Sequence, residues 1–447
     1  MALFLKRFNF GVRATFISAS RSSLPPLSSI TYRSFHGTKK VESPQLSQET
    51  IDIVKATAPV IAEHGYSITR NMYGRMLKDP EVAALFNPSH QVEMKGEKAH
   101  QPWTLACSVH AYAANIDNLA ALSEAVERIA QKHVSLYVLP RHYPIVAENL
   151  LWSIKHTLGD AATPEICKAW GEAVAFLADI FIKRETEIRE HKRDTVGGWL
   201  GWREFVVDRK VVESSEIVSL YLKPKDEGAL LDYPAGSYSA IRVEFDGIAT
   251  QRNYTLSKPA GHGHDGVWRI TVKRESPLFE GAPSGRVSGY IHDKVKEGDV
   301  LNMGVPCGDF VLKESNKPHV LISGGVGITP VLAMLEDLIN KTTKKTIYMI
   351  NTARCPEAEA MHDVLADYRR KHMNLFIKTL YDEGPDVYPK APLSMDQLDQ
   401  MIVDRDCEYY FCGPKGMMKT IYHGLRDHWN IPESQLHYEF FGPTEDL

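Results

Sequence analysis

The sequence predicts a multidomain protein, with an all-α domain first, then a small antiparallel β-barrel, then an α/β domain with a parallel sheet. The 447 residues are too many for one ordinary core. Apolar residues repeat at helical spacing in the first part and at strand spacing in the second, and in the third part short apolar runs alternate with helical stretches. We therefore expect a leader at 1–43 and domains at 44–193, 200–314 and 317–447.

Residues 1–43 form a basic leader. The first 41 residues contain seven Lys or Arg and many Ser and Thr, but no Asp or Glu. This composition is typical of a mitochondrial presequence, and the stretch YRSFHGTKK resembles a matrix processing site. We therefore expect recognition by the mitochondrial import machinery, cleavage within residues 34–43 and a location in the mitochondrial matrix, with the cytosol as a second location. The alternative is a disordered basic arm.

The rest of the chain is acidic. Outside the first 41 residues, 45 Lys and Arg stand against 56 Asp and Glu, a formal net charge of −11. This charge disfavours nucleic acid and anionic membrane surfaces as partners. No stretch approaches the roughly 20 consecutive apolar residues of a membrane span. The six cysteines form no CxxC pair, which favours a reducing compartment and argues against a zinc module or a disulfide scaffold.

Helical stripes define the first domain. In SQETIDIVKATAPVI, Ile51, Val54, Ala58 and Ile61 fall on one helix face, and similar stripes recur through the domain. Prolines at 80, 88, 140 and 164 divide this block into about seven helices.

One of these stripes contains a histidine. In AVERIAQKHVSLY, Val126 and Ile129 precede His133 at helical spacing, so an imidazole lies on a face that should be buried. Two polar residues are placed to serve it: Glu185 continues the apolar stripe of the last helix, and Tyr143 stands at a helix start. From spacing alone, a satisfied core histidine and a solvated Glu185 remain the alternatives.

In the second domain, the segment QRNYTLS carries a candidate anion site. Arg252 and Tyr254 share one face of a strand, so a guanidinium can pair with a pyrophosphate beside a phenol that lies along a flat ring system. Further on, SGRVSGYIHD can present the amides of Arg286, Val287 and Ser288 to the same phosphates. The alternative is a solvated strand arginine with a packed tyrosine.

The third domain contains two strand-to-turn segments. ISGGVGITP is an apolar strand followed by a Gly-rich turn and a helix, in which Thr329 can cap the helix and Pro330 suits its first position. YYFCGPKGM places Cys412 at the carboxyl edge of another strand, where ligands bind in such sheets. A Gly-rich turn can also be a plain tight connection.

Together, the motifs RNYT, GGVGITP and CGP resemble, in this order, the ferredoxin-reductase-like module that binds FAD and NADH or NADPH. The resemblance covers about 200–447. The residues that it implies for FAD are Tyr238, Arg252, Asn253, Tyr254, Thr255, Arg286, Val287 and Ser288. Those implied for the nucleotide are Gly325, Val326, Gly327, Ile328, Thr329, Pro330, Cys412, Gly413 and Pro414. The C-terminal HYEFFGP would lie by the flavin with Glu439, Phe440, Phe441, Gly442 and Pro443.

A flavin accepts a hydride and can release its two electrons singly, so its fusion to a helical domain suggests a one-electron acceptor there, most simply a haem iron. A flavin reductase whose helical domain holds no haem is the alternative. The segments KATAPVIAEHG, MYGRMLKDPEVAALFN, VERIAQKH and YPIVAENLLWSI then resemble the globin domain of flavohaemoglobins, and the later modules follow in the same order. This resemblance covers about 50–447 and is to the fungal type.

The flavohaemoglobin resemblance implies a role for each haem-site residue. His133 would be the proximal iron ligand of haem b, with Tyr143 and Glu185 as the relay behind it. The distal side would hold Tyr73 and Gln101, with Phe86 and Leu105 packed on the haem. The segment between Phe86 and Gln101 is longer than in the bacterial pattern, so His100 competes with Gln101 as the distal polar residue.

The same resemblance implies a nitric oxide dioxygenase that detoxifies nitric oxide (NO) under nitrosative stress. NO and O2 would become nitrate on the haem, which NAD(P)H would re-reduce through FAD. The expected partners are these small molecules, and the expected state is a monomer without integral membrane association. A haem-based oxygen sensor or store is the alternative reading.

Overall fold

The computed structural model describes residues 46–93, 97–260, 266–277, 284–341, 344–384 and 389–441. The expected leader at 1–43 lies outside the described residues, as do Gly442 and Pro443 of the expected flavin site.

The first domain is all helical, as the apolar stripes predict. Its helices are α2 (Gln48–Met76), α3 (Pro80–Ala84), α4 (His100–Ala114), α5 (Ser123–Ser135), α6 (Tyr143–Leu158) and α7 (Pro164–Asp194). Short 3₁₀ turns join them at Pro88–Gln91, Leu119–Leu122, Pro140–His142 and Gly159–Ala161. Each of the four prolines expected to divide the block opens one of these elements, because proline suits a first helical position but breaks a helix interior.

The helical core forms where α2 packs against α4, α6 and α7. Val54, Ala58 and Ile61 of the first stripe are buried there, and Ile51 is partly buried. Trp170 of α7 is among the largest side chains buried in this core. The apolar stripes therefore determine which face of each helix turns inward.

The second domain is an antiparallel sheet in the order β4-β3-β6-β1-β2-β5. Its strands are β1 (Arg203–Val212), β2 (Ile217–Pro224), β3 (Tyr238–Phe245), β4 (Ile248–Thr255), β5 (Trp268–Lys273) and β6 (Val300–Met303). Asp246 and Gly247, both at positive φ, form the tight turn between β3 and β4. A bridge between Leu256 and Ile270 joins the end of β4 to β5, which brings the two edges of the sheet together as a barrel. Helix α8 (Arg286–Asp293) lies beside β5.

The third domain is an α/β domain with the parallel sheet β11-β10-β7-β8-β9. Its strands are β7 (His319–Gly324), β8 (Ile347–Ala353), β9 (Leu375–Tyr381), β10 (Glu408–Cys412) and β11 (Leu436–Glu439). The helices are α9 (Ile328–Asn340), α10 (His362–Lys371), α11 (Met395–Met401) and α12 (Lys415–His423). Because β7 and β10 are neighbours, the Gly-rich turn and the CGP segment emerge side by side at the carboxyl edge of the sheet.

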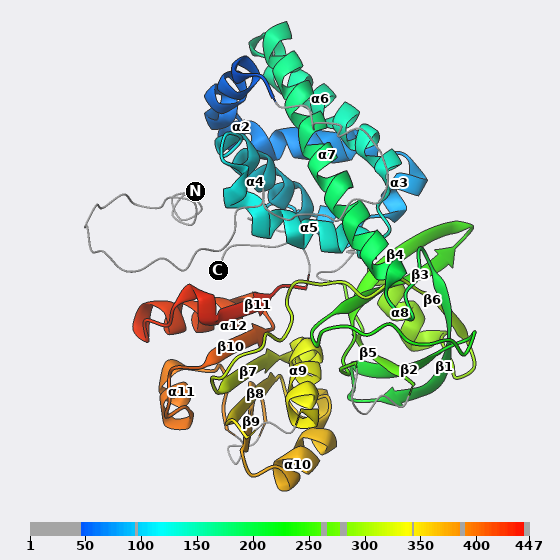
Figure 1. Ribbon diagram of the computed structural model, residues 1–447, viewed down its shortest axis with the longest axis vertical. Helices are drawn as coiled ribbons and strands as arrows, with labels where there is room; N and C mark the ends of the chain where they lie inside the picture. Colours follow the sequence, from blue (N-terminus) through cyan, green and yellow to red (C-terminus); the bar gives the residue numbers. More distant parts are fainter. Residues whose placement is uncertain are drawn as a thin grey trace, which may run out of the picture.

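Figure 1 shows how the three domains are arranged. The helical domain stands above the other two, with α7 reaching down to the barrel, and the α/β domain lies beside the barrel. The expected fold class, with all-α, antiparallel barrel and α/β parts in this order, is confirmed.

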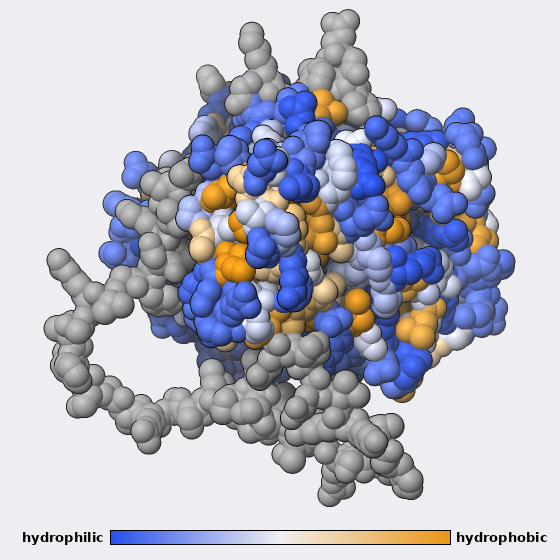
Figure 2. All heavy atoms as spheres, turned by 90° about the horizontal axis from the view of Figure 1, so that it is seen from above, coloured by the Kyte–Doolittle hydropathy of each residue, from blue (hydrophilic) through white to orange (hydrophobic). Residues whose placement is uncertain are grey.

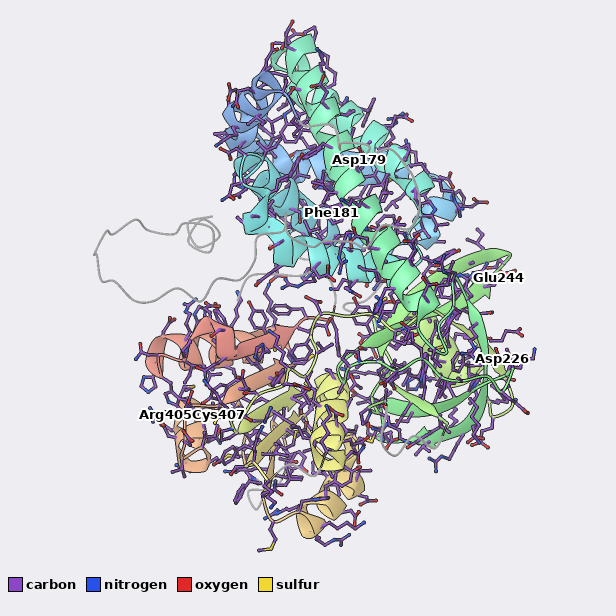
Figure 3. The ribbon with its side chains drawn as sticks, in the orientation of Figure 1. Asp179, Phe181, Asp226, Glu244, Arg405 and Cys407 are labelled. Atoms are coloured by element: carbon purple, nitrogen blue, oxygen red, sulfur yellow. The ribbon has the colours of Figure 1, made fainter. Side chains whose placement is uncertain are left out.

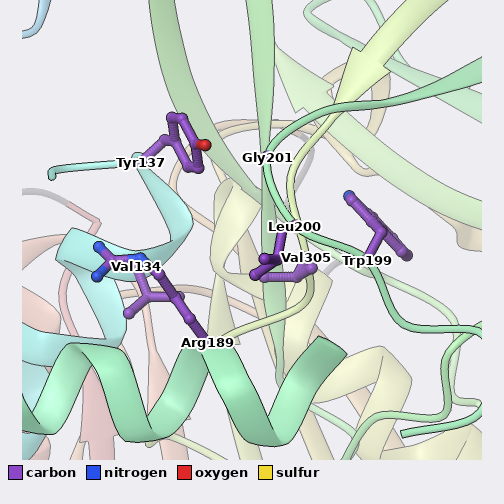
Figure 4. A pocket seen from close by; sticks show the side chains of 7 residues that line it. All are labelled: Val134, Tyr137, Arg189, Trp199, Leu200, Gly201 and Val305. Carbon is purple, nitrogen blue, oxygen red and sulfur yellow. The ribbon is translucent and has the colours of Figure 1, made fainter. Parts of the chain in front are cut away.

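The helical domain and the barrel meet around the carboxyl end of α5. A small cavity of about 10 Å³ lies at this junction, too small for a substrate (Figure 4). It is lined by Val134, Tyr137, Arg189, Trp199, Leu200, Gly201 and Val305.

The face of the molecule at the helical end is mainly hydrophilic, with smaller hydrophobic groups between the polar side chains (Figure 2). None of the helices in the described ranges is long and apolar enough to cross a membrane.

A buried histidine makes the stability of the α/β domain dependent on pH. His319 opens β7, is 1% exposed, and has no hydrogen-bond partner at either ring nitrogen within the described parts of the chain. Burial lowers its pKa to about 4, whereas an unfolded histidine titrates near about 6.5. Between these values the unfolded chain binds a proton that the folded chain does not, so stability falls as pH drops from about 6.5 to about 4, by roughly 3 kcal/mol at most.

We therefore expect His319→Leu to flatten the acid side of the curve of melting temperature against pH, measured by calorimetry from pH 7 down to pH 4.5. Some slope should remain, because burial also lowers the pKa of His90 to about 4. The exposed His64→Gln is the control and should keep the full slope. An unchanged slope in His319→Leu would show that other groups cause the acid loss.

Candidate haem and flavin sites

The histidine that the sequence singled out contacts two polar side chains, each from another helix. His133 lies in the last turn of α5, Tyr143 opens α6, and Glu185 lies in the second half of α7. The Nδ1 atom of His133 lies 2.7 Å from Oε1 of Glu185 and 3.1 Å from the hydroxyl of Tyr143. Tyr143 also donates a hydrogen bond to the same carboxylate oxygen. The expected grouping of these three residues is therefore present as a hydrogen-bonded triad.

The triad decides which nitrogen of His133 carries the proton. A carboxylate accepts hydrogen bonds, and the tyrosine hydroxyl already donates to it, so Nδ1 must donate its N–H to Glu185. The lone pair then resides on Nε2. This is the tautomer that binds a metal ion through Nε2, with its other nitrogen held by an acceptor.

Burial strengthens the hydrogen bonds of the triad. Glu185 is fully buried, and Arg189, one turn further along α7, lies 3.4 Å from its second oxygen. Burial first, and then the hydrogen bond to Glu185, raises the pKa of Tyr143, which keeps its hydroxyl a donor. Phe181, labelled on α7 in Figure 3, lies with its ring centroid 5.8 Å from that of His133. Sequence reasoning missed Arg189, although its i+4 spacing from Glu185 was a usable signal.

A second polar group lies on α2 and α4. Tyr73 is buried in the helical core, and its hydroxyl accepts a hydrogen bond from Nε2 of Gln101 at 3.3 Å. Burial raises the pKa of Tyr73 to about 12. The ring of His100, the competing candidate, instead lies 6.3 Å from the ring of His90. The structure thus brings Gln101 to the tyrosine.

Two apolar side chains complete this side of the domain. Phe86 packs edge-on against Tyr73, with 5.5 Å between ring centroids. Phe86 and Leu105 are both partly buried against the helical core. The donor set of the domain is therefore one imidazole with a free Nε2 and, from other helices, a phenol and an amide among apolar side chains. This set fits a haem, which needs an axial nitrogen on one face and a small polar pocket on the other.

On the barrel, the expected FAD segment lies on β4 and the neighbouring β3. Tyr238 pairs with Thr255 across the two strands, and Asn253 and Tyr254 precede Thr255 on β4. Arg252 donates hydrogen bonds to the backbone oxygen of Phe86, 2.7 Å away, and to Thr250 and Gln251 of its own strand. The guanidinium expected to bind pyrophosphate therefore also ties β4 to the helical domain. Sequence reasoning missed this contact, which no local pattern signals.

The carboxyl end of α5 is bonded to the same strand. Ser135 donates from Oγ to Oδ1 of Asn253 at 2.9 Å, and Gln251 donates to the carbonyl of Leu136 at 2.9 Å. Ser135 is two residues beyond His133. The haem-site histidine and the FAD segment are thus joined through one short path of covalent and hydrogen bonds.

The three expected amides lie in the first turn of α8. Helix α8 begins at Arg286, so the amides of Arg286, Val287 and Ser288 have no partner within the helix. The guanidinium of Arg286 stacks on Phe245 at 4.1 Å and pairs with Asp246 at 3.2 Å. The free amides and the positive end of the helix dipole suit a phosphate.

The C-terminal strand brings a buried carboxyl group to Tyr238. Among the described residues, neither Oε2 of Glu439 nor the hydroxyl of Tyr238, both buried, has a hydrogen-bond partner. Burial raises the pKa of Glu439 to about 7, and burial followed by the nearby Glu439 raises that of Tyr238 well above its usual value. Buried polar atoms without partners are rare, and two together fit the polar edge of a flavin ring. Phe440 and Phe441 follow, with Phe441 about half exposed.

The Gly-rich turn and the CGP segment touch at the carboxyl edge of the α/β sheet. A Cβ atom on Gly327 would lie 2.1 Å from the carbonyl oxygen of Cys412 and 2.9 Å from the nitrogen of Gly413. Gly325 has φ +54°, in the left-handed region. Only glycine allows this close approach. Both nucleotide motifs, including Val326 and Pro414, therefore lie together at the carboxyl edge of the sheet.

Two details of this turn differ from the sequence prediction. A 3₁₀ turn at Gly325–Gly327 runs straight into α9, which therefore begins at Ile328. Thr329 consequently lies inside the first helical turn and donates to the carbonyl of Val326 at 3.0 Å, so its predicted role as a cap is wrong. Pro330 occupies the third helical position and not the first. Proline is tolerated there because the amides of the first turn have no helical partner.

Three family models match the chain in the order of its domains. They are Globin over residues 70–181, Oxidoreductase FAD-binding domain over 204–312 and Oxidoreductase NAD-binding domain over 321–423. With the sites described above, they define the protein as an oxidoreductase that uses haem, FAD and NAD(P)H.

Proteins that align with this chain over nearly their whole length identify the family within this class of oxidoreductases. The chain is 42% identical to a flavohemoprotein of Halalkalibacterium halodurans over 413 residues, which is 90% of this chain and 98% of the relative. It is also 42% identical to a flavohemoprotein of Rhodopirellula baltica over 90% of this chain and 99% of that one. A crystal structure of flavohemoglobin from Malassezia yamatoensis with bound FAD and heme superposes with a TM-score of 0.74 at 25% identity, covering 89% of this chain and all of that chain. The chain belongs to the flavohemoprotein family.

Haem retention tests the role of His133. We expect His133→Ala to lose haem, because the triad prepares this imidazole for iron, while the flavin is still reduced by NADH and passes electrons to an artificial acceptor. The ratio of Soret to flavin absorbance and an acceptor assay measure the two properties. The exposed His156→Ala should keep both. Full haem retention in His133→Ala would identify another histidine as the ligand.

Proposed function

We propose that the protein is a nitric oxide dioxygenase that converts NO and O2 to nitrate with electrons from NAD(P)H and so detoxifies NO. The observation that carries this proposal is the buried triad of His133, Glu185 and Tyr143. A histidine that only stores oxygen needs no buried carboxylate behind it, whereas a histidine that must donate electron density to iron does.

When bound, haem iron holds the reacting gases and FAD delivers the electrons of NAD(P)H one at a time. Glu185 accepts the Nδ1 proton of His133 in a hydrogen bond, which increases the electron-donating power of Nε2. Tyr143 orients the same carboxylate. Arg189 lies against its second oxygen, which fixes the ring of His133 in one orientation.

Tyr73 and Gln101 are the polar groups that would lie beside reacting oxygen. The raised pKa of Tyr73 keeps its hydroxyl protonated at neutral pH, so it can donate a hydrogen bond to a partly negative oxygen. Gln101 holds that hydroxyl in place. Phe86 and Leu105 exclude water from the site.

In the reductase half, separate segments would bind the two electron-carrying cofactors, and hydrogen bonds join this half to the helical domain. The Gly-rich turn and Cys412–Pro414 would hold NAD(P)H at the edge of the α/β sheet. The β4 segment and the amides of α8 would hold FAD. The bonds from Ser135 and Arg252 then keep the FAD strand against the helical domain.

Rapid mixing of the oxygenated protein with NO tests the activity. With NADH and O2 present we expect repeated turnover and stoichiometric nitrate, followed by stopped-flow absorbance and nitrate analysis. A single slow oxidation without turnover would favour an oxygen sensor or store and would rule out the dioxygenase.

The carboxylate behind the histidine can be tested separately. We expect Glu185→Gln to keep haem and to lower the NO turnover number by roughly 10- to 100-fold, because the neutral amide polarises Nδ1–H less. The Fe–His stretching frequency in the ferrous protein should fall with it, which a loss of stability alone would not cause. The exposed Glu190→Gln on the same helix is the control. Equal turnover in both variants would refute the relay role.

We further infer that this is a mitochondrially targeted, fungal-type member of the family that acts as a monomer in the matrix. Support for the location comes from the acid-free basic leader. The alignments with the bacterial relatives cover nearly the whole of each relative but only 90% of this chain. The part of this chain that they leave uncovered is about as long as the leader.

Cell fractionation tests the location. We expect replacement of the seven leader Lys and Arg residues by Gln to leave the protein in the cytosol, because import depends on the positive charge of the presequence. Replacement of seven Lys and Arg residues on the surface of the body is the matched control and should not change import. Continued import without the leader charges would contradict the proposed targeting.

A further inference from the structure

A buried ion pair joins the barrel to the α/β domain. Arg269 on β5 donates from Nη2 to Oε1 of Glu336 on α9 across 2.9 Å. The two side chains are only 6% and 8% exposed. The residues are 67 positions apart and belong to different domains, so the pair forms only when the domains are docked.

Further hydrogen bonds hold both partners in one geometry. Arg269 donates from Nε to Oγ of Ser257 at 3.1 Å and from Nη2 to the carbonyl of Ser257. Tyr368 on α10 donates to Oε1 of Glu336 at 3.2 Å. The planar guanidinium is thus bonded on two sides, which fixes its direction as well as its position. Separating the pair would leave two charges in surroundings that cannot solvate them, and this is costly.

The ends of this network lie beside the two cofactor segments. Ser257 comes two residues after Thr255, where β4 and the FAD motif end. Glu336 lies about two turns into α9, which begins directly at the Gly-rich turn Gly325–Gly327. β5 itself packs against this turn. The pair therefore links the FAD strand to the nucleotide turn.

A side chain of α9 also reaches the barrel near the start of β3. A Cβ atom on Gly236, which has φ +104°, would lie 2.2 Å from the carbonyl oxygen of Phe310 and 2.7 Å from Cε of Met334 on α9. Met334 therefore packs where only a glycine leaves room for it. A shift of the helix away from the barrel must break the ion pair.

We propose that Arg269 and Glu336 are positioning residues that set the distance between nicotinamide and flavin, and so determine the rate of hydride transfer without touching either cofactor. The proposal rests on the proposed function only for the use of FAD and NAD(P)H. In this step a C–H bond of the reduced nicotinamide breaks, the hydride and its electron pair reduce the flavin, and the nicotinamide is oxidised. Reacting atoms must approach to about 3 to 3.5 Å, and an error of about 1 Å can cost roughly 100-fold in rate.

The test replaces both charges together, because a single removal would leave the other charge buried and could unfold the protein. In the double variant Arg269→Met/Glu336→Met we expect flavin reduction at saturating NADH to slow about 10- to 100-fold, while the apparent dissociation constant of NADH changes less than roughly threefold. Anaerobic stopped-flow absorbance of the holoprotein measures both values. An unchanged limiting rate in the folded variant would overturn the proposal.

Hydrogen exchange gives a second readout that does not depend on activity. In the full-length double variant the amides of α9 and β5 should exchange faster, while those of the helical domain stay protected. Unchanged exchange at α9 and β5 would also overturn the proposal, because the pair would then not hold the docking.

The matched control is Glu216→Gln. It removes a more exposed ion pair between Glu216 of the barrel and Arg354 of the α/β domain, together with the 3.7 Å pair of Glu216 with Lys273 on β5, and should leave the limiting rate unchanged. If this control slowed flavin reduction as much as the double variant, the effect would belong to domain contact in general and the proposal would fail. Normal flavin reduction without NO turnover in the unmodified protein would refute the dioxygenase alone, so the two failures are distinguishable.

Discussion

The last turn of α5 is hydrogen-bonded to α7 on one side and to the barrel strand β4 on the other. The arrangement of the helical domain relative to the reductase half depends on these bonds. On one side the Nδ1–H of His133 is held by Glu185, a residue of α7 with no exposed surface. Two residues later, Ser135 is bonded to Asn253 on the barrel strand β4. Because both sets of bonds lie within one helical turn, the position of β4 is coupled to that of His133. In the proposed assignment of haem to His133 and of FAD to β4, a few hydrogen bonds around a single turn therefore set a distance that electrons must cross.

The two junctions of the molecule are built from different interactions. Between the helical domain and the barrel, neutral side chains and Arg252 bond to backbone oxygens or to each other, and Arg128 of α5 forms a partly exposed ion pair with Asp309 of the barrel. Such bonds contribute about 1 kcal/mol each, and water can replace their partners. Between the barrel and the α/β domain, Arg269 and Glu336 are charged and almost fully buried. Opening this second junction costs more, which suits a step in which a hydride passes at contact distance.

Local chemistry explains where sequence reasoning succeeded and where it failed by a few residues. The Gly-rich turn was recognisable because only glycine permits the approach of Gly327 to the carbonyl of Cys412. The roles of Thr329 and Pro330 were misassigned because a 3₁₀ turn continues into α9, so the helix begins before both residues. Arg252 was recognisable as part of a motif, yet its bond to Phe86 was not, since that partner is 166 residues away.

The sequence by itself determined the order of the domains, the inward faces of the helices and the identity of His133 as the unusual residue on a buried stripe. These properties follow from periodicity and short motifs, which neighbouring residues encode. Only the tertiary structure decided that Glu185, 52 residues away, meets His133, and that Gln101 reaches Tyr73. It alone also brought Arg269 to Glu336. The physical reason is that a pattern along the chain records which face is buried, whereas contact between distant side chains depends on how complete domains pack.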